Sequence, residues 1–474
     1  MNIRGRLILA CTIAALPVLS AGQSPTAPNL PPQSSADASK PAPAGAVSAL
    51  IGMLPEGGAD DTSADLPQIP ALLGGPAISS AFISELERSN YLRGGLNVGA
   101  VYDSNPLLLS SGRDSNTSES IFPNIRIEES SSRLRWTLGY AGGLTVDQKI
   151  TNQNQGSHNL NFDTQYRLSP HVNLRVAENF SLTTGFFDAG NGPEVVAGSV
   201  GPNASLIAPL STERSSITTV ETNYHFALND LIGASGSFYD LHFTNVPAGT
   251  QLTNSQTATG SAFWLHRLFA KDWGGVSYRF DRITFNPGGG ESRVHSFLAT
   301  NTLRLSNRFT LTGFIGPQYS ENQGLAPSGM PAPNAWSVAG GAEGAWANQR
   351  TSLSVGYSRT ISDGGGILGS VRLQSVYGAF RRELVPGWAV ALTASHGTNR
   401  SLIVSSINDA SSINLTTAGI SLERNVGKSI GLRLGYSHDF QEEFGLPAAN
   451  PTLDAHRNRF FASLSYQWAK PLGM

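Results

Sequence analysis

The sequence predicts an all-β fold, a transmembrane up-and-down antiparallel β-barrel of about 18 strands (16–18) that follows a disordered N-terminal leader. Three observations predict it. Segments of about ten residues with apolar side chains at alternate positions recur from Tyr91 to Trp468. The connections between these segments alternate between tight and long. Charged residues make up only 14% of the 474 residues, against roughly 25% in soluble domains.

The N-terminus has the pattern of a secretory signal peptide over residues 1–22. Arg4 and Arg6 precede an apolar run from Leu7 to Leu19, and small residues at 20–22 offer a cleavage site. The single cysteine, Cys11, lies inside this run. The mature chain is therefore expected to need no disulfide in an oxidising compartment.

Residues 23–85 are rich in Pro, Ala, Ser and Gly, a composition that cannot bury enough apolar surface to order itself. We expect a disordered periplasmic leader or linker. Two short apolar patches, Ala46–Leu54 and Ile78–Leu86, leave open a docking segment or a plug for a pore.

Residues 91–468 have the two-residue period of half-buried strands. Leu92, Leu96 and Val98 share one face of the first strand, and Arg93 lies on the other. Three later strands change phase midway, which predicts β-bulges. These strands lie near Leu231–Phe243, Val276–Phe285 and Ile413–Leu422.

Tight and long connections follow one another in strict alternation. The tight ones are Ser130–Ser132, Ser169–His171, Asn229–Asp230, Ala270–Asp272, Ser306–Arg308, Asn348–Gln349, Leu384–Gly387 and Asn425–Lys428. The long ones are Asp103–Ser118, Val146–Gly156, Phe187–Glu213, Asn245–Thr253, Gly288–Glu291, Asn322–Pro331, Ser362–Gly366, Asn399–Ala410 and Gln441–His456. Outer-membrane barrels alternate in this way, with short periplasmic turns and long outer loops. Both chain ends then fall on the periplasmic side.

The tight turns share an Arg-Leu pair, for example at Arg167, Arg267 and Arg304, which indicates a repeated hairpin unit. Aromatic residues near the strand ends predict interfacial girdles. These aromatics are Tyr102, Trp136, Tyr166, Phe180, Tyr224, Trp273, Trp346, Trp388 and Trp468.

No motif predicts an enzyme. The sequence lacks a phosphate loop, a zinc-binding helix motif and a nucleophile elbow, and its nine histidines are scattered. We expect no cofactor and no metal site. The formal net charge of -2 argues against a nucleic-acid partner, which would require a basic patch.

The polar side chains on the inward faces are the candidates for function, because about eighteen strands leave an aqueous interior unless something fills it. The pore-lining candidates are Arg93, Arg135, Asn161, Asp163, Arg167, Arg175, Glu221, Arg279, Asp281, Glu343 and Arg433. The alternative is that these residues form networks that only fill the interior. The longest loop, Phe187–Glu213, is either an inward constriction or an outer cap.

The last strand ends in Leu464, Tyr466 and Trp468 at alternate positions, which resembles the C-terminal insertion signal of bacterial outer-membrane barrels. The tail 469–474 departs from that pattern, which usually stops at the aromatic residue. Residues 91–468 resemble the bacterial outer-membrane β-barrel porin class, and more specifically β-barrel porins found alongside exopolysaccharide systems. The segment Val101–Asn105, the long loop after it and the Arg-Leu turns carry this resemblance.

The resemblance and the strand pattern imply a protein of the cell outer membrane that passes polar solutes or saccharides. One alternative is a barrel associated with exopolysaccharide export, in which the leader binds a periplasmic partner. Another is a structural or adhesive barrel with a filled interior. The expected partners are outer-membrane lipid and the barrel-assembly machinery, with a periplasmic protein bound by the leader in the export alternative.

Overall fold

The computed structural model describes residues 90–106, 114–149, 155–184, 211–244, 252–286, 290–306, 308–323, 334–364, 370–402, 412–427, 429–444 and 455–472. The expected signal peptide and leader lie outside these ranges, and so do residues 187–210 of the longest loop. Within the described ranges, no helix is long and apolar enough to cross a membrane.

The chain forms eighteen strands. The first nine are β1 Tyr91–Asp103, β2 Asn116–Ser130, β3 Leu134–Asp147, β4 Gln155–Arg167, β5 Val172–Thr184, β6 Thr212–Ala227, β7 Asp230–Thr244, β8 Asn254–Phe269 and β9 Asp272–Asn286. The others are β10 Glu291–Ser306, β11 Phe309–Gln323, β12 Ala335–Ala347, β13 Thr351–Ser362, β14 Val371–Val385, β15 Trp388–Ser401, β16 Ser412–Val426, β17 Ile430–Phe444 and β18 Ala455–Pro471.

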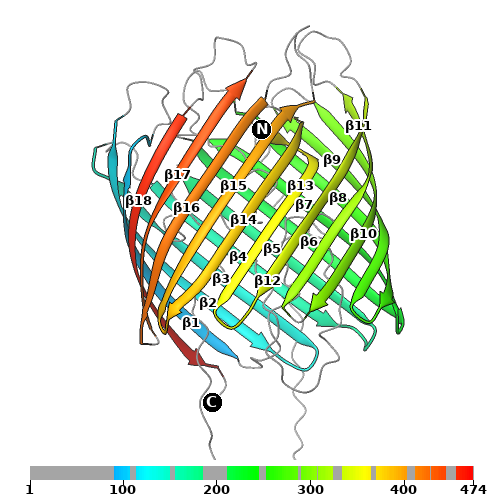
Figure 1. The fold of residues 1–474 in the computed structure, drawn as a ribbon, viewed down its shortest axis with the longest axis horizontal. Coiled ribbons are helices and arrows are strands. Elements are labelled where there is room, and N and C mark those ends of the chain that lie inside the picture. Colours follow the sequence, from blue (N-terminus) through cyan, green and yellow to red (C-terminus); the bar gives the residue numbers. More distant parts are fainter. Residues whose placement is uncertain are drawn as a thin grey trace, which may run out of the picture. The chain divides into compact units, whose positions relative to one another are not determined.

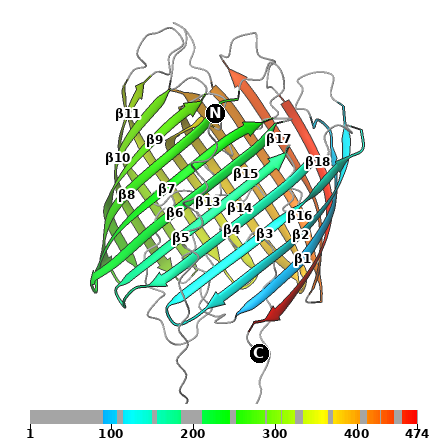
Figure 2. The ribbon, with the colours of Figure 1, turned by 180° about the vertical axis from the view of Figure 1, so that it is seen from behind.

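These strands close into a barrel. Each pairs with its neighbours in sequence, all antiparallel, and β18 pairs with β1 from Tyr91↔Pro471 to Asp103↔Arg459. The strands run obliquely around the wall (Figures 1 and 2). A closed antiparallel barrel has no free sheet edge, so its strands satisfy one another's backbone groups without water. The predicted fold and strand number are confirmed.

Connection lengths divide the barrel into two ends. Eight connections of two to four residues join the strands at one end, which we call the turn end. Nine connections of four to twenty-seven residues lie at the other, which we call the loop end. Asn90 and Leu472 both lie at the turn end, where the Leu472 amide donates to the Asn90 carbonyl at 2.7 Å. The predicted alternation is therefore correct.

The Arg-Leu turns are one structural unit used repeatedly. The backbone N–H groups of Arg167, Arg267 and Arg304 each donate to a carbonyl in the preceding hairpin's turn, at 2.8 Å. The acceptors are Arg133, Asn229 and Lys271. The repeat therefore links successive hairpins around the turn end.

The outer face of the wall is apolar. On β3, Leu144 and Val146 are 60% and 50% exposed, and on β18 Phe460 is 54% exposed. A surface of this kind is stable only against lipid. The girdle prediction is wrong for Trp273, which points inward and is buried with Leu231, Phe263 and Leu265.

The predicted bulges in β7, β9 and β16 are wrong. These strands pair with both neighbours in continuous register over the predicted segments, and the register shifts of β6 and β8 lie beside the tight turns instead. The change of phase arises because inner positions near the loop end are apolar and buried, among them Leu241, Ile283 and Ile413. Apolar side chains on both faces shift the apolar pattern by one position, which is also the effect that an inserted residue would have on the sequence.

Candidate functional site: the interior of the barrel

Small polar side chains are frequent on the inner face of the barrel. They alternate along each strand with the apolar side chains of the outer face, because successive side chains of a strand point to opposite sides. On β10, Ser292, Ser296 and Thr300 are buried inward positions. Ser292 donates to Asn322 of β11 at 2.8 Å, and Gln318 donates to Ser296 at 3.1 Å. Hydroxyl–amide contacts of this kind give the wall a neutral polar surface.

Most charged pore-lining candidates are paired along the wall. Arg175 Nη2 lies 2.6 Å from Asp163 Oδ2, and Arg279 Nη2 lies 2.7 Å from Asp281 Oδ1. Each pair consists of one positive and one negative side chain. The wall therefore carries local dipoles instead of large patches of one charge.

Two further pairs involve carboxylates that the sequence did not single out. Arg93 Nε lies 3.5 Å from Glu128 Oε2. Arg433 Nε lies 3.7 Å from Glu423 Oε1, and Arg381 shares that carboxylate at 3.2 Å. These acids were not predicted as partners, because only the strand register shows which inward side chains meet.

The structure also places the remaining candidates. Glu221 accepts from Asn223 at 2.8 Å and lies opposite Arg175. Asn161 lies opposite Gly139 and Arg135 opposite Gln165, while Arg167 is exposed in the last position of β4. The candidates therefore spread around the wall and form no single cluster.

Glu343 is positioned by an aromatic side chain from two strands away. Tyr377 of β14 reaches across Gly356 of β13 and hydrogen-bonds the Glu343 carboxylate of β12. A Cβ atom at Gly356 would lie 2.3 Å from Tyr377 Cζ. Glycine is therefore the residue that lets the ring cross the strand.

Along β17, β18, β1 and β2, burial of the inner face increases from the turn end to the loop end. Near the turn end, the side chains of Arg93 and Arg126 are 37% and 47% exposed. Near the loop end, Arg457 and Gln441 are 0% and 1% exposed. The interior is therefore packed at the loop end, whereas at the turn end it is exposed along β1 and β2 and packed along β7 to β9 by the cluster around Trp273.

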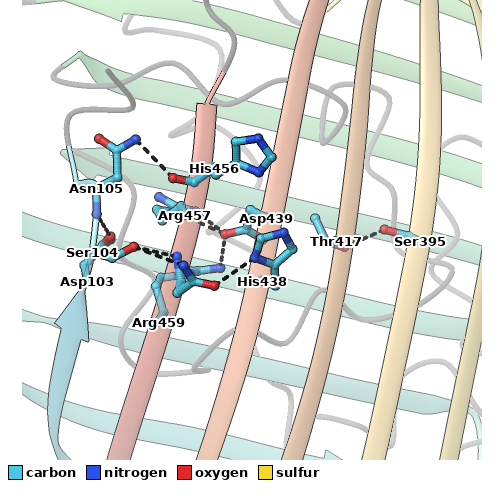
Figure 3. A network of polar contacts seen from close by, with 11 residues as sticks. Asp103, Ser104, Asn105, Ser395, Thr417, His438, Asp439, His456, Arg457 and Arg459 are labelled. Atoms are coloured by element: carbon cyan, nitrogen blue, oxygen red, sulfur yellow. Dashed lines mark hydrogen bonds and ion pairs between the residues drawn. The ribbon is translucent and has the colours of Figure 1, made fainter. Parts of the chain in front are cut away.

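A buried charge cluster near the loop end was missed in the sequence (Figure 3). Asp439 Oδ2 accepts from Arg457 Nε and Nη2 at 3.0 and 2.7 Å, and Arg459 Nη2 lies 2.9 Å away. Arg459 also lies opposite Asp103 in the β1–β18 register, and Asp103 is buried beside them. Arg457 and Arg459 lie just outside the apolar run that defined the last strand, so the pattern did not include them.

The interior narrows where the end of β13 approaches β8, β9 and β10. Ser255 of β8 donates to Asp363 Oδ2, although four strands separate β8 from β13 in the wall. Ile361 packs in one buried cluster with Ile283 and Val294 of β9 and β10. These contacts span part of the interior, because they join strands that are not neighbours in the wall. We use the term constriction for the group formed by Ser255, Ile283, Val294, Ile361 and Asp363.

Among the residues that the structure describes, no group of three or more histidine, cysteine or acidic side chains is placed to hold a metal ion.

No family model matches the chain, and no curated protein matches it either. Three similar solved structures are the FrpB iron transporter from Neisseria meningitidis (F3-3 variant) and two proteins of Pseudomonas aeruginosa, the outer membrane protein OpdK and OccK2 (OpdF). Identities are 11%, 10% and 10%, and TM-scores are 0.42, 0.41 and 0.43. The matches cover 80% of this chain and 67%, 99% and 98% of those chains.

The identity of the fold follows from the geometry itself. Closure of all strands, an exposed apolar outer face and a polar interior are together the properties of a barrel that lipid surrounds. The protein is an integral β-barrel of the bacterial outer membrane.

Proposed function

We propose that this barrel is a channel for small polar solutes, with saccharides among them. The observation that carries the proposal is the exposed, polar inner wall along β1 to β4, where Arg126 and Asn161 face the interior. A barrel of this strand number is wide enough to hold water unless side chains fill it.

The pairing of charges favours neutral or weakly charged solutes. Carboxylates beside Arg175, Arg279 and Arg433 cancel most of the net field while leaving hydrogen-bonding groups along the wall. Sugars can exchange water for such groups, whereas apolar solutes find no favourable surface.

The constriction would set the size limit. It is held by the hydrogen bond between Ser255 and Asp363 and by the contact of Ile361 with Ile283 and Val294. The polar contact is the part that a single substitution can release, because the apolar cluster stays in place when Asp363 loses its carboxylate.

Liposome swelling with neutral sugars of increasing size tests this function. Wild-type proteoliposomes are expected to swell in a pentose and to swell less as the sugar grows. Asp363→Ala should raise the rate for the larger sugars. Ser261→Ala is the matched control, because Ser261 is a buried inward hydroxyl of the same strand, six residues from Ser255, and it pairs with Ser235 of the neighbouring strand at 2.7 Å. Absence of swelling from folded wild-type barrels would refute the proposal.

A further inference from the structure

The wall of the barrel is incompletely paired between β12 and β13 near the loop end. Their ladder stops at Gly340↔Arg359, although β12 begins at Ala335 and β13 continues to Ser362. Over these residues each strand stays paired on its other side, β12 with β11 and β13 with β14. Each strand therefore has a short edge that pairs with no strand among the described residues.

The unpaired end of β13 lies inside the barrel. Ile361 belongs to the outward set of β13, in phase with Tyr357, which is 43% exposed on the outer wall. Ile361 is nevertheless only 8% exposed and packs with Ile283 and Val294, which are inward positions of β9 and β10. We call residues 360–364 the β13 tip. The tip has left the wall and forms one side of the constriction.

The position of the tip inside the barrel combines favourable and unfavourable contacts. Ser255 donates a hydrogen bond to Asp363, and the apolar cluster buries Ile361. Asp363 also acts as a like charge on the buried Glu213 carboxylate of β6, so the two acids repel each other. In addition, the free edge of β12 lacks the ladder that a membrane barrel normally provides for its backbone groups.

The register of the existing ladder defines a second position for the tip. Continuing that register toward the loop end places Ile361 opposite Val338 on the outer face and Ser362 opposite Ser337 on the inner face. Val338 is 51% exposed in the observed position. Apolar side chains would then meet on the lipid side and hydroxyl groups inside, and cross-strand pairs of this kind stabilise a sheet. The free edges of both strands would be paired.

We propose that the β13 tip is a gate of the channel with two positions. In the closed position, which the structure shows, the tip lies in the interior and narrows it. In the open position the tip pairs with residues 335–339 of β12, completes the wall and leaves the interior. This inference rests on the proposed channel function, because a gate requires a pathway to control.

Disulfide trapping tests the gate, because two cysteines join only when their Cα atoms lie within about 7 Å. The only cysteine of the sequence, Cys11, lies in the expected signal peptide, so introduced cysteines have no native competitor in the mature barrel. Val338→Cys with Ile361→Cys should trap the open position, and Ser255→Cys with Asp363→Cys should trap the closed position. The matched control is Ala342→Cys with Tyr357→Cys, because these two residues lie opposite each other in the part of the ladder that both positions share.

Single-channel conductance of each folded variant is compared after oxidation and after reduction of the same sample. Oxidation should raise the conductance of the open pair severalfold, lower that of the closed pair severalfold and leave that of the control pair unchanged. Ser337→Cys with Ser362→Cys, the next pair of the extended register, replaces the open pair if that variant does not show the heat-modifiable mobility of a folded barrel.

Failure of the gate and failure of the channel give different results. If the control disulfide forms but neither open pair does, the tip does not reach β12 and the gate is refuted. The gate is also refuted if the open-pair disulfide forms without changing the conductance, and in both cases a conducting wild type leaves the channel function intact. If the trapping disulfides form but no sample conducts, oxidised or reduced, the channel function is refuted, and with it the role of the moving tip as a gate.

Discussion

At the scale of single residues, glycine decides how aromatic rings cross the inner wall. Tyr377 lies over Gly356, and Phe461 lies over Gly435, where an added Cβ would be 2.2 Å from the ring. In both cases the ring reaches a charged neighbour: Tyr377 bonds Glu343, and Phe461 lies 5.6 Å below the Arg433 guanidinium. These rings tie adjacent strands together through side chains as well as through backbone.

Replacing Gly356 with alanine should therefore destabilise the barrel by about 1–3 kcal/mol, because the new methyl group forces the Tyr377 ring off Glu343. Gly378→Ala is the control, since its added Cβ would meet no atom closer than 3.8 Å. Urea unfolding in detergent micelles measures both. Equal unfolding midpoints would show that the ring does not depend on Gly356.

Asp439 holds two buried arginines, so its loss should be more costly than that of an exposed acid. Asp439→Ala is expected to reduce the free energy of unfolding by about 3–5 kcal/mol, because Arg457 and Arg459 lose a shared carboxylate. Asp272→Asn, at an exposed hydrogen bond with Asn301, should cost less than about 1 kcal/mol. The same urea titration compares them, and a small effect at Asp439 would refute this role.

The sequence predicts the face of a side chain better than its partners. Alternation placed Arg93, Arg175 and Arg433 on the inner face, but their acids follow from strand register, which no local pattern contains. Trp273 was misplaced for a related reason. A tryptophan near a strand end has the same position in the sequence whether it faces lipid or an inward apolar cluster.

At the scale of the elements, the alternation of short and long connections was the most reliable signal. It fixes the strand count and the end at which each turn lies, because an antiparallel barrel permits only that order. The apolar period failed where β7, β9 and β16 approach the loop end, since burial there makes both faces apolar. The apolar period of a strand shows which of its side chains are buried. In β7, β9 and β16 the period changes because both faces become apolar, and the prediction of bulges from that change was wrong.

The last strand supplies a prediction for assembly. Leu464, Tyr466 and Trp468 lie on the outer face of β18 and are 50%, 52% and 41% exposed. We predict that Tyr466→Ser with Trp468→Ser lowers the amount of folded barrel in cells severalfold, because the insertion signal is lost. Ser465→Ala with Gln467→Ala, on the inner face of the same strand, is the control. Comparable amounts of folded protein in both variants would contradict a signalling role for the outer face.

At the scale of the whole molecule, the barrel has three surfaces with different chemistry. The outer wall is apolar apart from charged groups near the loop end, the interior is polar and exposed toward the turn end of β1 to β4, and the loop half is packed around the constriction. Composition and period predicted the first two surfaces. The constriction depends on contacts between β8 and β13 across the interior, so it could not be predicted from neighbouring residues.

Single-channel conductance of the refolded mature protein in a planar bilayer shows whether the interior is an open polar channel. We predict steady conductance steps that are larger in Asp363→Ala, because release of the Ser255 contact widens the narrowest part of the interior. A folded, heat-modifiable barrel that conducts no ions, as wild type and as this variant, would contradict an open polar interior.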